Sequence, residues 1–245
     1  MVNTAIYPAT AQPPARANLL ASWWHTLAIV LIVLALSLLG AKMAPALVQR
    51  YGRLFFYAVN TCVEWLLVGM VWFGIRVRGV RLRDLIGGRW KSIAGALLDG
   101  VIALGFWIVS GITLNLVGRF VLGIAARGAV QQYAGFLFPQ TGMEGIAWAV
   151  VALTAGFCEE LIFRGYLQKQ FQAMTGSAML GALLQAVVFG AAHGYQGMRL
   201  MILIAVYGFL FGLLMIWRKS LRPGIAAHAW QDLLSGWFGR MLQHG

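Results

Sequence analysis

Two adjacent glutamates and an arginine lie inside an apolar stretch of the C-terminal half, in the sequence Glu-Glu-Leu-Ile-Phe-Arg at 159–164. In a helix, Glu160 and Arg164 share a face and can form an ion pair, whereas Glu159 is turned by about 100° onto a different face. A structural ion pair that locks two helices accounts for one carboxylate. The Glu159 carboxylate has no arginine of its own to pair with, so Glu159 is a candidate catalytic residue.

Two histidines provide further candidate groups. His193 ends an apolar segment rich in glycine and alanine, and His228 precedes Asp232 by four residues, so that this pair shares a helical face. Taken alone, the first is typical of an interfacial residue and the second of a local hydrogen bond. However, Thr175-Gly176-Ser177 predicts a turn between two helices, and Glu159 and His193 each lie 17 residues from Gly176. An antiparallel hairpin therefore places them at one level.

A buried carboxylate and two imidazoles suit the hydrolysis of a peptide bond. In a low-dielectric site, Glu159 can act as a general base near neutral pH and take a proton from a water held by His193. His228 and its helix partner Asp232 can stabilise the oxyanion of the tetrahedral intermediate. Alternatively, Glu159, His193 and His228 can hold a divalent metal that activates the water. The His-Glu-x-x-His pattern of zinc proteases does not occur in the sequence, so a conventional zinc site is not supported.

The elements that must position these residues are membrane-spanning helices. Hydrophobic residues make up 60% of the 245 residues and charged residues 11%, compared with about 25% charged in ordinary soluble domains. This composition excludes a soluble globular domain and a disordered chain. A spanning helix needs roughly 20 mainly apolar residues. We predict an all-α polytopic transmembrane helical bundle with seven spans, at 26–46, 54–75, 92–117, 144–168, 177–195, 198–217 and 223–243.

The segment 118–142 is the ambiguous part of this pattern, because its apolar runs are short. It is either a re-entrant or interfacial helix, or an eighth span that inverts everything after it. We divide the chain into a loose N-terminal tail at 1–24, N-terminal transmembrane helices with a basic loop at 25–143, and a transmembrane core at 144–245 that carries the candidate site.

The charge distribution indicates membrane topology. The chain has 19 Lys and Arg against 7 Asp and Glu, a formal net charge of +12. In a chain this apolar, the basic excess predicts orientation in a bilayer rather than binding of nucleic acid. With seven spans and the N-terminus inside, the dense basic cluster at 76–91 is a cytoplasmic loop on anionic headgroups, and 218–222 is also cytoplasmic.

Acidic residues inside spans indicate function, because an ionisable group in hydrocarbon costs at least about 2.5 kcal/mol. Those in or beside predicted spans include Asp99, Glu144, Glu159, Glu160 and Asp232. A transporter or proton-relay protein would also keep such residues and is one alternative function. A catalytically silent immunity or partner protein on the same scaffold is another. The crowding of acids and histidines into the last hundred residues, without two related halves, favours an enzyme.

Three motifs together resemble those of the CAAX protease and bacteriocin-processing (CPBP) family of intramembrane endopeptidases, which includes the type II CAAX prenyl endopeptidase. They are Glu-Glu-x-x-Phe-Arg at 159–164, Phe-x-x-x-His at 189–193 and His-x-x-x-Asp at 228–232. The motifs occur in order in consecutive late spans, and the resemblance covers about 144–236. It implies the catalytic residues Glu159, His193, His228 and Asp232, supported by Glu160, Arg164 and Phe189.

The resemblance also implies roles. Glu159 would be the water-activating base with His193 beside it, and His228 and Asp232 would stabilise the oxyanion or act as ligands. Position 232 is often Asn in the prenyl endopeptidases, and an ionised Asp cannot donate to an oxyanion. A protonated Asp232, an Asp232 that orients His228 and one that binds a cation are all open. Both a metal-dependent mechanism, with Glu159, His193 and His228 as ligands, and a metal-free glutamate mechanism are open.

These expectations describe a multi-pass integral membrane endopeptidase, located in the cytoplasmic membrane if the host is bacterial. Its partners would be the lipid bilayer and a peptide or protein substrate in or at the membrane. Prenylated CAAX tails, leader peptides and transmembrane signals are all open as substrates.

Overall fold

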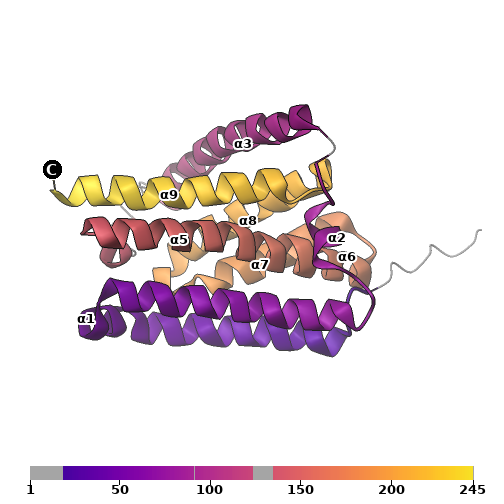
Figure 1. The fold of residues 1–245 in the computed structure, drawn as a ribbon, viewed down its shortest axis with the longest axis horizontal. Helices are drawn as coiled ribbons and strands as arrows, with labels where there is room; N and C mark the ends of the chain where they lie inside the picture. Colours follow the sequence, from indigo (N-terminus) through magenta and orange to yellow (C-terminus); the bar gives the residue numbers. More distant parts are fainter. Residues whose placement is uncertain (1–18, 91, 124–134, 245) are drawn as a thin grey trace, which may run out of the picture.

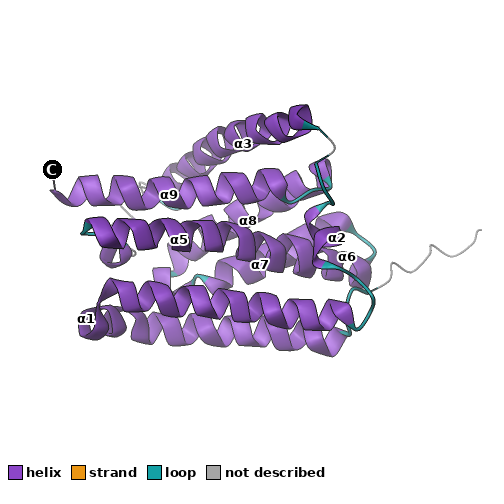
Figure 2. Ribbon diagram, viewed as in Figure 1, coloured by secondary structure: helices purple, strands orange, loops and turns teal. Residues whose placement is uncertain are grey.

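The computed structural model describes residues 19–90, 92–123 and 135–244, and this part of the chain consists of helices joined by loops and turns, with no strand (Figure 2). The predicted all-α class is therefore confirmed. The elements in chain order are α1 (Trp23–Arg76), α2 (Leu82–Ile86), α3 (Ile93–Phe120), η1 (Gly135–Leu137), α5 (Gly142–Glu159), η2 (Glu160–Leu167), α6 (Gln168–Thr175), α7 (Ala178–Ala192), η3 (Gly194–Gln196), α8 (Met198–Arg218) and α9 (Arg222–His244).

Helix α1 contains two of the predicted spans, folded back on each other. Its 54 residues are interrupted at Gly52, whose φ of 81° and ψ of 167° are not helical, a conformation that glycine adopts readily. Across the resulting hairpin, His25 Nε2 donates to the Met70 carbonyl at 3.0 Å. A Cβ at Gly74 would lie 2.3 Å from the His25 ring, so only glycine permits this approach. Figure 1 shows the two halves side by side.

Each of the other predicted spans also coincides with a helical segment. By length and composition, α1, α3, the continuous run Gly142–Thr175 and α8 are long and apolar enough to cross a membrane, and α7 is a shorter apolar helix. These features are those of an integral membrane protein. The ambiguous segment 118–142 lies partly outside the described residues, at 124–134. Its described end forms the short helix η1, where the Leu137 carbonyl accepts a hydrogen bond from the Tyr57 hydroxyl.

The helices surround α5 and its continuation. In Figure 1, α9 lies between α3 and α5, the α1 hairpin covers the other side of α5, and α7 and α8 pack behind. The largest buried cluster joins α1 to η2 and α7 through Ile29, Val71, Leu161, Ile162 and Phe189. The polar residues described below therefore lie among tightly packed helices.

The segments predicted to be cytoplasmic meet at one end of the bundle. The Ile86 carbonyl accepts a hydrogen bond from Leu221 N at 3.0 Å, which joins the basic loop to the start of α9. Leu20 N donates to Gln170 Oε1 at 2.8 Å, and Ala21 is buried, so the described end of the predicted loose tail is held in place.

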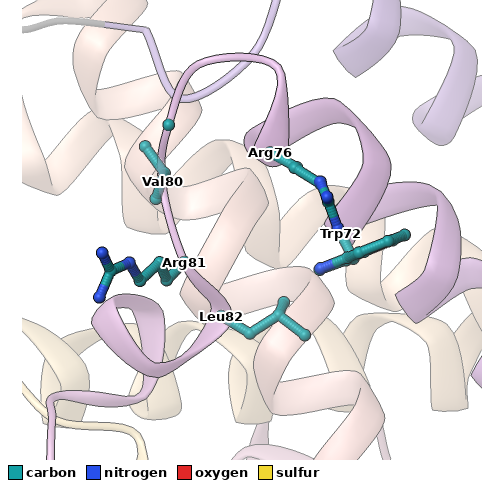
Figure 3. A pocket seen from close by; sticks show the side chains of 6 residues that line it. Trp72, Arg76, Val80, Arg81 and Leu82 are labelled. Atoms are coloured by element: carbon teal, nitrogen blue, oxygen red, sulfur yellow. The ribbon is translucent and has the colours of Figure 1, made fainter.

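The same end carries exposed arginines around a cavity of about 340 Å³ (Figure 3). The Arg76 guanidinium lies 4.9 Å from the Trp72 ring centroid, and Arg81 also lines the cavity. Tryptophan and cations are typical of the headgroup region of a membrane. This end is therefore suited to contact with anionic headgroups.

Candidate active site

The two glutamates lie where the helix changes its winding. Glu159 is the last residue of α5, and Glu160 begins the π-helix η2, whose eight residues are all buried. Winding of this kind is rare and occurs frequently at functional sites. No pattern in the sequence predicted it.

The predicted pairing of Glu160 with Arg164 is present. Arg164 Nη1 lies 2.9 Å from Glu160 Oε1, and both side chains are almost completely inaccessible, at 0% and 1% exposed. The guanidinium also donates to the Gly208 carbonyl at 3.3 Å and stacks on the Phe189 and Phe211 rings, 4.2 and 4.8 Å from their centroids. The arginine thus links η2 to α7 and α8 around one carboxylate.

His228 on α9 lies between the carboxylates. Its Nδ1 donates to Glu160 Oε1 at 3.1 Å, while its Nε2 lies 3.6 Å from Glu159 Oε2 and 3.7 Å from Asp232 Oδ2. Both carboxylates thus reach the same imidazole. They can do so because the two ring nitrogens face in different directions.

Glycines allow α9 to approach α5 and Glu160 closely. A Cβ at Gly156 of α5 would lie 2.7 Å from Ala229 N, and a Cβ at Gly224 would lie 3.0 Å from Glu160 Oε2. A larger residue at either position would move the helices apart. The small residues next to the charged motifs therefore determine how deeply His228 is inserted.

Asp232 lies one turn after His228 at the more accessible side of the site, with 31% of its side chain exposed. Two tryptophans hold this turn of α9: Trp148 Nε1 donates to the Asp232 carbonyl at 2.8 Å, and Trp107 Nε1 donates to Gln231 Oε1 at 2.6 Å. The predicted shared face of His228 and Asp232 is thus present, and the aspartate approaches Nε2 from the side on which Glu159 also lies.

His193 caps the end of α7 and faces the same site through Phe189. Its Nδ1 donates to the Phe189 carbonyl at 2.9 Å, and its ring lies 4.9 Å from the Phe189 ring. The Phe189 ring also contacts Phe163 at 4.8 Å and lies 6.2 Å from His228. Phe163 and Phe189 lie at equal distances along the chain from Gly176, so their contact confirms the predicted register of the hairpin.

The histidines do not touch each other. His193 has no hydrogen bond or ion pair with Glu159 among the contacts of the described residues. Both imidazoles instead lie near the Phe189 ring, which connects them.

A buried acid that the sequence analysis did not single out also faces the site. Glu64 lies on α1 within the buried stripe formed by Tyr57, Val68, Val71 and Ile75. Its Oε1 accepts from Asn60 Nδ2 at 2.8 Å, and its buried Oε2 has no hydrogen-bond partner in the described part of the chain. It interacts electrostatically with Glu159, Asp232 and His228. Its place in a helical apolar stripe is the signal that could have identified it.

Two other acids of the predicted spans have structural roles outside the site. Glu144 and Thr141 form a reciprocal cap at the start of α5, with both hydrogen bonds at 3.2 Å. Asp99 accepts from Arg218 Nη2 at 3.0 Å and from Trp90 Nε1 at 2.9 Å. Both acids anchor helix ends.

The donor arrangement does not fit a bound metal ion. Across the described residues, no group of three or more His, Cys, Asp and Glu side chains is placed to hold one. His228 directs Nδ1 at Glu160, and its Nε2 lies between the carboxylates of Glu159 and Asp232. Glu159, His193 and His228 thus do not converge as three ligands.

Comparison with known proteins identifies the part of the chain that carries these residues. Residues 141–234 match the family described as Type II CAAX prenyl endopeptidase Rce1-like. The match includes all three motifs from which the resemblance was predicted, and it confirms that resemblance. No curated protein and no solved structure matched the chain.

Proposed function

We propose that this protein is an intramembrane endopeptidase, and the match of residues 141–234 to the Type II CAAX prenyl endopeptidase Rce1-like family supports this proposal. It hydrolyses a peptide bond of a membrane-associated or lipid-anchored substrate with a water activated by Glu159. The observation that carries this proposal is the convergence of Glu159, Glu160 and Asp232 on the buried His228.

Glu159 is the residue suited to activate water. Its Oε2 is buried, accepts no hydrogen bond from the described residues, and lies 3.6 Å from His228 Nε2. His193 uses Nδ1–H on the Phe189 carbonyl, so Nε2 of the neutral ring is an acceptor. A water between them donates one hydrogen to each. Glu159 takes the proton as the water oxygen attacks the substrate carbonyl carbon, and the carbonyl π electrons move onto oxygen.

His228 is suited to stabilise that oxyanion. Because Nδ1–H is donated to Glu160, which Arg164 pairs, the ring is held with Nε2 toward Glu159 and Asp232. The Nε2–H of the imidazolium donates to the substrate oxygen. When the oxyanion collapses, the carbon–nitrogen bond breaks and Glu159 returns the proton to the leaving nitrogen. The products are a carboxylic acid and an amine.

The substrate and location follow from the environment of the site. The site lies among apolar helices, so the scissile bond is in or at the membrane, and the basic end of the bundle contacts anionic headgroups. In a bacterial host this is the cytoplasmic membrane. Prenylated tails, leader peptides and transmembrane signals are the substrate classes that a screen should include.

The proposal is tested with Glu159→Ala, His193→Ala and His228→Ala, each compared with Asp84→Asn, which changes an exposed acid. Comparative proteomics of strains carrying each variant should show an uncleaved membrane or exported protein for the three site variants alone, with each variant present in the membrane. Full cleavage by any of the three would refute the mechanism. Solute or proton flux in liposomes that survives Glu159→Ala would support a transporter instead.

A further inference from the structure

A tyrosine that belongs to none of the three motifs lies against the candidate site. Tyr207 on α8 has its ring centroid 6.3 Å from that of His228. Its hydroxyl is buried and makes no hydrogen bond within the described residues. Buried tyrosine hydroxyls usually have a partner, so this one has a donor available for a bound molecule.

Aromatic rings fix Tyr207 beside the site. The ring packs edge-on against Phe211 at 4.6 Å and parallel to Phe106 at 6.5 Å. Phe211 in turn lies 5.3 Å from the His228 ring. Tyr207 is therefore held next to the imidazole that Glu159 and Asp232 also approach.

The site has many acceptors and few donors. Three carboxylates surround His228, and His193 uses its Nδ1–H on a backbone carbonyl. An ionised Asp232 cannot donate to an oxyanion. Of the groups described above, His228 Nε2–H is the one donor aimed at the reacting region, whereas oxyanions are commonly stabilised by several preorganised donors.

We propose that Tyr207 is a further catalytic residue, whose hydroxyl donates a hydrogen bond to the substrate carbonyl oxygen as it becomes the oxyanion. The inference rests on the proposed peptidase function. The hydroxyl proton stays on Tyr207 throughout, and no bond to the tyrosine forms or breaks. The hydrogen bond strengthens as negative charge develops on the substrate oxygen, so it acts mainly in the transition state.

The test compares Tyr207→Phe with the wild type in lipid nanodiscs, using a prenylated CAAX peptide and a panel of transmembrane-segment peptides. We expect kcat to fall by about 10²–10³-fold with KM unchanged, as when one oxyanion donor is removed elsewhere. Tyr51→Phe removes an exposed hydroxyl and should change neither constant. Tyr166→Phe removes a buried hydroxyl bonded to His25 and Thr26, so it should lower stability without a specific loss of kcat.

A second readout separates catalysis from folding. A peptide phosphinate imitates the tetrahedral oxyanion, and its affinity is compared with that of the uncleaved peptide, both measured in the Glu159→Gln background. Tyr207→Phe should weaken phosphinate binding and leave peptide binding unchanged. The ratio of these two affinities does not depend on how much of the protein is folded.

The outcomes distinguish the two proposals. If the wild type cleaves a peptide and Tyr207→Phe matches Tyr51→Phe in both kcat and the affinity ratio, the role of Tyr207 is overturned and the peptidase function stands. If the wild type neither cleaves any peptide nor binds the phosphinate, the peptidase function fails and the role of Tyr207 fails with it.

Discussion

Replacing Arg164 with methionine would remove the cation at the centre of the bundle. The guanidinium is 0% exposed and pairs with a Glu160 carboxylate that is 1% exposed. After the substitution, the Glu160 carboxylate loses this cation and keeps the hydrogen bond from His228. The change also removes the donor to the Gly208 carbonyl.

The expected cost follows from the burial of the pair. Breaking a buried ion pair by removing one partner costs about 3–5 kcal/mol, because a charge is left uncompensated. This is a large part of a typical unfolding free energy of about 5–15 kcal/mol. Removing both charges, as in Glu160→Leu with Arg164→Met, should recover much of that loss. Arg164→Lys should recover little, because an ammonium cannot bond Glu160 and Gly208 while stacking between Phe189 and Phe211.

The assay is equilibrium unfolding in bicelles for the wild type, both single variants and the double variant, analysed as a double-mutant cycle. Arg83→Met is the matched control, because its ion pair with Asp84 is long, at 3.8 Å, and exposed, and pairs of this kind contribute little. Two results would contradict the reasoning: an Arg164→Met variant as stable as Arg83→Met, or a double variant no more stable than Arg164→Met alone.

Three further predictions concern the geometry of the site. Gly156→Leu should push α9 away from α5 and reduce kcat/KM for peptide cleavage by about 10²-fold. Gly100 has open space around it, so the Gly100→Leu variant should cleave normally in the same peptide assay. Glu64→Leu places an apolar residue in an apolar stripe, so it should raise the unfolding free energy and lower the rate of cleavage. A Glu64→Leu variant that is less stable than the wild type, or fully active, would show that Glu64 has a structural role. Because the described donors do not fit a metal ion, dialysis against a chelator should leave cleavage unchanged, and recovery of a lost activity by added zinc would refute this.

Local patterns predicted a substantial part of the molecule. The spacing of Glu160 and Arg164 predicted their contact, and the turn at Gly176 predicted the hairpin register that Phe163 and Phe189 confirm. These features depend on helical periodicity and on short separations along the chain. The sequence therefore contains enough information for them.

The relations between distant helices could not be obtained in this way. Glu159 and Glu160 both reach His228, whose place depends on the close approach of Gly156 to Ala229. A one-dimensional pattern shows which face of a helix is apolar but does not show which helix covers that face.

By itself, the sequence determined that this protein is a bundle of membrane-spanning helices and that its acids and histidines crowd into the last spans, because hydropathy and motif order are properties of the chain. Only the tertiary structure decided that Glu64 and Tyr207 face the same site as His228. The reason is physical. Lipid solvates the apolar faces of all spans almost equally, so the choice of neighbours is made by side-chain packing between helices, and that packing exists only in the folded bundle.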